Sequence, residues 1–194
     1  MNTLKKTNSS VLTLIAFIAL TFNLSQAQTF NLSNQESSLT VLGTSSLHDW
    51  HITAENQGGK ISFKNLSEGS LEACTLVVTS ESLKSGKSSM DKNTFKSLKT
   101  NEHKTITFHL AEVKEVTNKG NGKFYVKTMG DLTIVGVKKR VSLDFNMDTT
   151  SGKVTLTGEK KFKMTDFKID PPKALLGTIT TGDDITIKFS TIYK

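Results

Sequence analysis

The short segment from Gly43 to Asp49 contains the residue types that many hydrolases use for catalysis. Gly43 to Leu47 follows the pattern of a nucleophile elbow until its last position, where that motif requires glycine and this chain has leucine. Ser45, His48 and Asp49 also lie too close together on one extended segment to converge as a catalytic triad. We therefore predict that the protein is not an enzyme.

Four histidines, at positions 48, 51, 103 and 109, are the candidate metal ligands. In a strand, positions 48 and 51 point to opposite faces, and no spacing of histidines or cysteines resembles a zinc site. Asp183 and Asp184 follow Gly182, a sequence that is typical of a tight turn rather than of an acid–base pair. We predict neither a metal site nor a cofactor.

Cys74 and Trp50 are the only cysteine and tryptophan of the chain. Cys74 lies in a nearly continuous apolar strand, where a thiol acts as a small buried hydrophobe, and a single cysteine can form no intramolecular disulfide. His48 and Trp50 share one strand face. We interpret Trp50 as an aromatic plug at one end of the strands, with its indole N–H bonded to a nearby acceptor, in preference to a residue that contacts a ligand.

The N-terminus has the features of a secretory signal peptide. Lys5 and Lys6 precede an apolar run at residues 11–24, and Ser25-Gln26-Ala27 matches a small-x-small cleavage site. We expect a signal peptide at residues 1–27 and one mature domain at residues 28–194, located in the periplasm or secreted. No second long apolar stretch follows, so we predict no transmembrane span in the mature chain.

The charge of the chain does not indicate a nucleic-acid partner. The leader contains two lysines and no acidic residue, so its removal lowers the formal net charge from +7 to +5. The remaining lysines are dispersed along alternating segments and turns, and Arg140 is the only arginine. Bidentate recognition of phosphates by guanidinium groups is therefore not expected.

After residue 28, apolar and polar residues alternate along several short segments, which is the pattern of half-buried β-strands. The alternation is clearest from Thr105 onward and includes two strands that we expect at Phe162–Asp170 and Thr180–Phe189. Short turns join neighbouring segments, and we expect them at Asn118–Gly122, Gly136–Lys139 and Ser151-Gly152. This pattern predicts an antiparallel all-β domain of seven to nine strands, built as a sandwich or a closed barrel.

One segment, Ser88 to Lys99, lacks this alternation and predicts a short helix. Ser89 is the expected cap and Asp91 lies in the first turn. The apolar face of this segment is sparse, so we expect the helix to lie over one end of the strands rather than to drive folding.

Four segments occur in the order and spacing of one known family: Gly43–Trp50, Gly130–Lys139, Phe162–Ile169 and Thr181–Ile185. In these segments the chain resembles the YceI-like family of exported polyisoprenoid-binding proteins. The resemblance implies a lipocalin-like, eight-stranded antiparallel barrel with one short peripheral helix. It also implies an apolar tunnel for the tail of a long isoprenoid, such as a quinone or polyprenyl carrier, or of a similar long-chain lipid.

The candidate ligand-binding residues are the apolar residues that alternate on the dry faces of the expected strands. They are Ile106, Phe108, Leu132, Ile134, Val141, Leu143, Phe145, Phe162, Met164, Ile185, Ile187 and Phe189. The leading function is a lipid carrier, and the runner-up is a ligand-free filled barrel with a structural or stress-response role. A third, less favoured alternative is an enzyme that acts on a lipid head group near His48. The sequence does not decide between a monomer and a homodimer.

Overall fold

The computed structural model describes residues 28–194, so the expected signal peptide lies outside the described residues. Strands dominate this part of the chain: β1 (Gln28–Asn31), β2 (Ser38–Ser45), β3 (Trp50–Ala54), β4 (Gln57–Asn65), β5 (Ser70–Thr79), β6 (Leu83–Lys84), β7 (Thr105–Gly120), β8 (Lys123–Ile134), β9 (Val137–Asp148), β10 (Val154–Lys163), β11 (Lys173–Ala174) and β12 (Ile179–Tyr193). The helical elements are α2 (Ser88–Ser97) and four short 3-10 helices, η1 (Asn34–Glu36), η2 (Ser80–Ser82), η3 (Met164–Phe167) and η4 (Leu175–Gly177).

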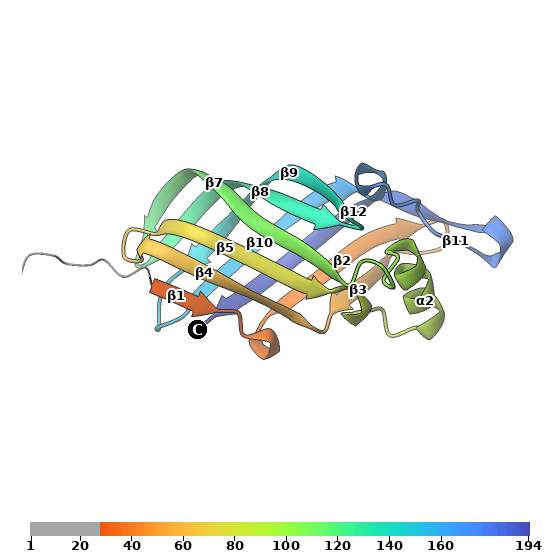
Figure 1. The fold of residues 1–194 in the computed structure, drawn as a ribbon, viewed down its shortest axis with the longest axis horizontal. Coiled ribbons are helices and arrows are strands. Elements are labelled where there is room, and N and C mark those ends of the chain that lie inside the picture. The colour runs from red at the N-terminus through yellow and green to blue at the C-terminus, as the bar shows by residue number, and fades with distance from the viewer. Residues whose placement is uncertain (1–27) are drawn as a thin grey trace, which may run out of the picture.

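The strands form one antiparallel sheet that returns to itself (Figure 1). β2 pairs with residues 181–190 of β12, while β1 reaches the end of β12 through the Leu32–Tyr193 bridge and hydrogen bonds between Asn31 and Lys194. β4 pairs with β1 on one side and with β5 on the other. In the same way, β3 pairs with β2 and with β6. From β5 the sheet continues through β7, β8, β9 and β10 to β12.

The expected all-β barrel is therefore confirmed, although the number of strands differs from the prediction. Twelve separate strands occur in residues 28–194 where eight were expected. The pairings group them into eight antiparallel runs, because β1 with β2, β3 with β4, and β5 with β6 each form one interrupted run. β11 is a two-residue addition that pairs only with β12.

The expected helix is present as α2, the one α-helix of residues 28–194, and it lies at one end of the barrel (Figure 1). The predicted cap at Ser89 is wrong, because the residue that precedes the first turn is Lys87, without a side-chain cap. Asp91 lies in the first turn as expected, and its carboxylate accepts hydrogen bonds from Ser85 N at 2.8 Å and Ser85 Oγ at 2.6 Å. These bonds fix the start of the helix to the loop that precedes it.

The turn expected at Gly136–Lys139 lies one residue earlier than predicted. Val135 and Gly136 connect β8 to β9 and have φ values of 49° and 72°, the left-handed backbone of a two-residue type I′ hairpin. Lys138 and Lys139 already belong to β9. The prediction missed the turn because valine, a β-branched residue, is rare in this conformation.

The strand expected at Phe162–Asp170 ends early. β10 stops at Lys163, and Met164 to Phe167 form the 3-10 helix η3. The carboxylate of Asp166 accepts a hydrogen bond from Lys163 N at 3.0 Å, and such local side-chain bonds compete with strand pairing.

The tight turn expected at Asp183 and Asp184 is also wrong. Both residues lie within β12, where the register with β2 shifts between Thr181 and Ile185. Asp183 accepts hydrogen bonds from Thr165 N at 2.9 Å and Thr165 Oγ1 at 2.6 Å, so this irregular part of β12 holds η3 in place.

The interior is divided between a filled half and a hollow half. Around the hairpins near β1, large side chains such as Phe63, Phe124 and Tyr193 form a cluster of eleven buried residues. Two smaller clusters, around Ile52 and around Phe167, lie along the walls of the other half, towards α2 and η3. Leu98 and Ile106 pack against both of these clusters, and a cavity lies among the side chains of this half.

Candidate ligand-binding cavity

A cavity of about 370 Å³ occupies the hollow half of the barrel. Its wall is contributed by strands from all sides of the barrel, and its lining is almost entirely apolar. This volume lies at the lower end of the range typical for pockets that bind small molecules. The shape and chemistry suit an apolar ligand or the apolar part of an amphiphile.

All twelve predicted ligand-binding residues line this cavity. The register explains why they converge: Phe108 pairs with Leu132 and Phe162 with Ile185, so these side chains share the inner face of the sheet. Met164 lies in η3 rather than in a strand, yet its buried side chain still faces the cavity. Contact between these residues and a ligand stays a prediction.

Half of the wall was missing from the predicted set. Strands β2, β3, β5 and β6 contribute further apolar residues to the lining: Leu39, Val41, Ile52, Leu76, Val78 and Leu83. Alternation at Leu39 and Val41 was visible in the sequence, but the strands in this part of the chain are short and interrupted. The pairing of β2 with β12 would have identified Leu39 and Val41. Their ladder partners, Phe189 and Ile187, were already in the predicted set, and partners across a ladder face the same side.

The floor of the cavity is formed where the hollow half meets the filled half. Cys74, Leu156 and Tyr193 belong to the buried cluster and also line the cavity. The Cys74 Sγ lies 3.9 Å from the Tyr193 hydroxyl, and burial raises the pKa of the Cys74 thiol to about 11. Burial also raises the pKa of Tyr193. Cys74 is thus a buried, protonated thiol, as its apolar strand predicted.

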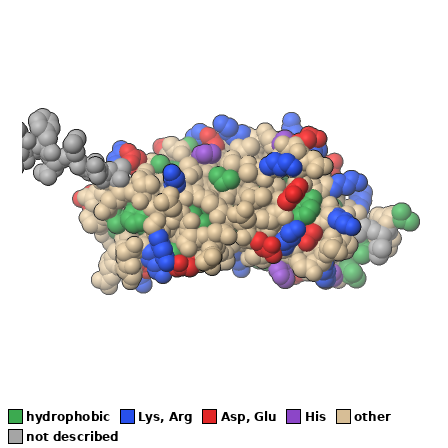
Figure 2. All heavy atoms as spheres, turned by 60° about the horizontal axis from the view of Figure 1, so that its bottom comes forward, with side chains coloured by type: hydrophobic (Ala, Val, Ile, Leu, Met, Phe, Trp, Pro, Cys, Tyr) green, Lys and Arg blue, Asp and Glu red, His purple; other side chains and the backbone are tan. Residues whose placement is uncertain are grey.

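The mouth of the cavity lies at the end of the barrel that carries α2. We define the mouth by its exposed lining residues: Leu47, His48, Lys87, Ser89, Asn93 and Lys173. The loop before β3 and the start of β12 are tied together, because Ser46 N donates to Thr180 O at 2.9 Å and Thr180 N donates to Ser46 Oγ at 3.1 Å. Figure 2 shows hydrophobic, basic and acidic side chains mixed on the surface at this end.

Two large apolar side chains are exposed, and one of them, Leu47, lies at the mouth. Leu47 is 66% exposed, and Leu176, in η4, is fully exposed. They are the exposed large hydrophobic residues of the described chain. An apolar ligand that enters the cavity would therefore meet the Leu47 side chain at the mouth.

Trp50 lies in the wall near the mouth. Its indole Nε1 donates a hydrogen bond to Thr44 O at 2.8 Å, which supplies the expected acceptor. The ring packs over Gly43, where an added Cβ would lie only 2.1 Å from Cζ2 of the indole. His48 is exposed, and its Nδ1 lies 2.8 Å from Asp49 O. Trp50 and His48 both line the cavity, so the choice between plug and ligand contact stays a prediction.

No group of three or more histidine, cysteine, aspartate or glutamate side chains in residues 28–194 is close enough to hold a metal ion. In the same part of the chain, no helix has the length and apolar character needed to cross a bilayer.

A family model, the YceI-like domain, matches residues 21–193 of this sequence. The chain belongs to the YceI-like family. This match covers the whole cavity wall and confirms the resemblance that the four sequence segments suggested. No curated protein matches the chain.

Solved structures with YceI-like folds are similar to this one at low sequence identity. BcnA from Burkholderia cenocepacia is 13% identical with a TM-score of 0.68, over 84% of this chain and 99% of that one. A polyisoprenoid-binding domain from Saccharophagus degradans, implicated in plant cell wall breakdown, gives the same identity and TM-score over 85% and 97%. The YceI protein of Campylobacter jejuni is 19% identical with a TM-score of 0.55, over 72% and 82%. At these identities the comparisons establish the fold.

Proposed function

We propose that this protein is a non-catalytic carrier that holds a long isoprenoid, such as a quinone or polyprenyl lipid, in its barrel. The observation that supports the proposal most directly is the apolar cavity, which is open at the α2 end and closed by Cys74, Leu156 and Tyr193 at the other. Membership of the YceI-like family and the fold shared with a polyisoprenoid-binding domain support the same ligand class.

The apolar lining supplies the binding energy without a charged contact to the tail. Each buried methylene contributes about 0.8 kcal/mol, so one five-carbon isoprene unit contributes roughly 3–4 kcal/mol before ordering costs. Affinity for a neutral isoprenoid should therefore increase with the number of isoprene units until the cavity is filled. It should depend little on salt, because no ion pair with the tail is broken.

Trp50 offers a direct measurement of this binding. It is the only tryptophan of the chain and it lines the cavity near the mouth. Delipidated protein titrated with isoprenols of increasing length should show a change in tryptophan fluorescence and a rising affinity. The carrier proposal fails if isoprenols of every length leave the fluorescence unchanged and the protein purified from its own host carries no lipid. The filled half of the barrel would then favour the second candidate, a ligand-free protein with a structural or stress-response role.

We also propose that the protein acts outside the cytoplasm, in the periplasm or as a secreted protein, and that residues 28–194 are its single mature domain. The basis is the sequence pattern of residues 1–27. N-terminal sequencing of the protein from fractionated cells of its own host should find a start near Gln28. Recovery of a cytoplasmic protein that retains Met1 would contradict export.

A further inference from the structure

The hydrogen-bonded ladder of the barrel is interrupted between β9 and β10. β9 pairs with β8 along its whole length, and β10 pairs with β12 along its whole length. β9 and β10, however, pair with each other only from Thr155–Asp148 to Gly158–Phe145. Residues 137–144 of β9 and 159–163 of β10 therefore have ladder partners on one side only. We call this interruption the side slot.

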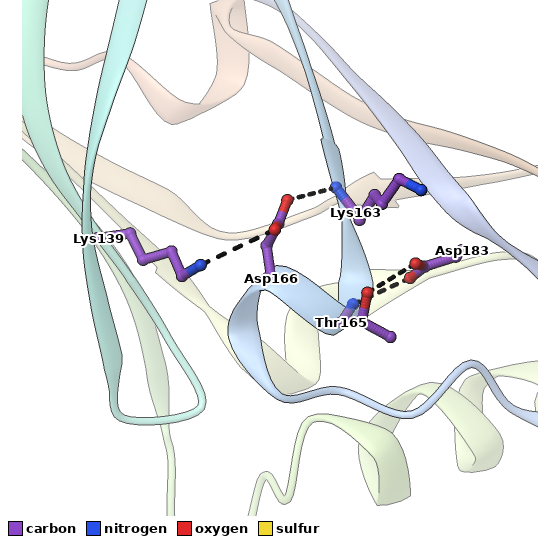
Figure 3. A network of polar contacts seen from close by, with 5 residues as sticks. All are labelled: Lys139, Lys163, Thr165, Asp166 and Asp183. Atoms are coloured by element: carbon purple, nitrogen blue, oxygen red, sulfur yellow. Dashed lines mark hydrogen bonds and ion pairs between the residues drawn. The ribbon is translucent and has the colours of Figure 1, made fainter.

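Side chains from both edges of the side slot line the cavity. Val141 and Leu143 come from β9, and Lys160 and Phe162 come from β10. The far end of the slot is held by η3 (Figure 3), where Lys139 of β9 lies 3.8 Å from the Asp166 carboxylate and Asp183 of β12 binds Thr165. The slot thus has two limits along the wall. One is the paired segment of β9 and β10, and the other is this polar network.

Lys160 breaks the apolar pattern of β10. Leu156, four residues earlier on the same face, and Phe162, two residues later, line the cavity, and the ladder partner of Lys160, Ile187, does so as well. Lys160 is the one charged residue that the eight barrel runs of the described chain place in the lining; the other two lysines of the lining, Lys87 and Lys173, lie at the mouth. A lysine at an inner-face position costs stability unless its ammonium group reaches water or a hydrogen-bond partner.

The Lys160 side chain reaches across the side slot to β9. Its Nζ donates a hydrogen bond to Ser142 Oγ at 3.0 Å, and Ser142 is an exposed residue between the inward-facing Val141 and Leu143. No carboxylate of residues 28–194 lies within 4 Å of this ammonium group. The stem of Lys160 therefore contacts the apolar interior while its charge is held at the outer edge of the slot, bonded only to a neutral hydroxyl.

The two edges of the slot are positively charged. Six basic residues against two acidic ones, Asp144 and Glu159, lie in the unpaired segments: Lys138, Lys139, Arg140, Lys160, Lys161 and Lys163. Arg140 is bound by Asp131, with Nε 2.6 Å from Oδ1, and Lys139 by Asp166, whereas the charge of Lys160 has no acidic partner. An ammonium group is a donor without acceptor capacity, so its complement is an anionic oxygen.

We propose that the side slot is a head-group site, where Lys160 and Ser142 bind the anionic phosphate of a polyprenyl-phosphate-type lipid whose tail occupies the cavity. This inference rests on the proposed carrier function and specifies its ligand. The head group would remain at the wet outer edge of the slot, so the phosphate keeps part of its hydration. The tail contributes affinity, and Lys160 contributes the discrimination between an anionic and a neutral head.

The test compares a polyprenyl phosphate with the polyprenol of the same tail length. Lys160→Met keeps an apolar stem of similar length and removes the charge. Lys161→Met is the matched control, because Lys161 is exposed and its ladder partner Thr186 lies on the outer face, between the cavity-lining Ile185 and Ile187. Affinities are measured by calorimetry on the full mature protein, with inorganic phosphate alone as a third probe.

We expect Lys160→Met to weaken binding of the polyprenyl phosphate roughly 10-fold more than binding of the polyprenol, the scale of one charge-assisted hydrogen bond at a partly hydrated site. Lys161→Met should change neither affinity. Equal losses for both lipids, or no loss for either, would overturn the head-group site while the carrier function stands. Lys160-dependent binding of inorganic phosphate alone would also overturn it, because the site would then be a general anion site. Failure of the parent protein to bind either lipid would instead overturn the carrier function itself.

Discussion

Gln57 is a buried side chain whose amide makes no hydrogen bond within the described residues. It is 4% exposed, and neither Nε2 nor Oε1 has a partner. Because an unsatisfied buried amide costs about 1–3 kcal/mol, Gln57→Met should raise the free energy of unfolding by about 1–2 kcal/mol. Chemical denaturation measures this change, with the exposed Gln35→Met as the control that should have no effect. A loss of stability in Gln57→Met would mean that buried water satisfies the amide.

Cys74 should make stability fall at alkaline pH. Its pKa rises from 9.0 to about 11 on folding because the thiol is buried. Below pH 9 both states hold the proton and the free energy of unfolding is unaffected. Between pH 9 and 11 the unfolded chain loses its proton first, so the folded state loses about 2 kcal/mol from this group. Chemical denaturation at several pH values measures the free energy of unfolding over this range. Its decline should be smaller in Cys74→Ala than in the parent protein by about that amount. Parallel declines in the two proteins would contradict this explanation.

At the scale of single elements, the β8–β9 hairpin carries backbone strain at Val135. Its φ of 49° is costly for a β-branched residue, whereas asparagine before glycine suits this turn type. Val135→Asn and Val135→Ala both remove the same partial packing against the cluster around Phe167. The asparagine variant should be more stable than the alanine variant by about 1 kcal/mol in thermal or chemical unfolding. Equal stabilities would show that the turn relaxes without strain.

The long strands could be predicted from the sequence, and the interruptions could not. Alternation located β7 to β10 and β12 because one face of each is apolar. The breaks between β1 and β2 and between β3 and β4 depend on which strand lies opposite, which is information that local patterns lack. Alternation predicts a strand at η3 because it does not reveal the bonds that hold this segment, which include the two that Thr165 donates to Asp183, eighteen residues away.

For the whole molecule, the apolar pattern predicted which side chains face inward but not how much space they leave. Inward residues at Phe63, Phe124 and Tyr193 fill one half of the barrel, whereas Val141 and Leu143 border the cavity in the other. Filling depends on which residues meet across the barrel, and this follows from register and closure rather than from alternation. For the same reason the pattern gave twelve correct lining positions and omitted the wall formed by β2, β3, β5 and β6.

The central claim, that the cavity holds a lipid tail, is tested most directly by narrowing the cavity without disturbing the outside of the barrel. Leu143→Trp enlarges an inward residue of β9 that lines the cavity, and Asn146→Trp places the same side chain on the exposed face of the same strand. Native mass spectrometry, with circular dichroism to verify folding, measures a bound long-chain isoprenoid. We predict that the parent protein and Asn146→Trp carry the lipid, and that folded Leu143→Trp does not. Lipid binding by folded Leu143→Trp equal to that of the parent, or a parent protein that takes up no lipid, would contradict the claim.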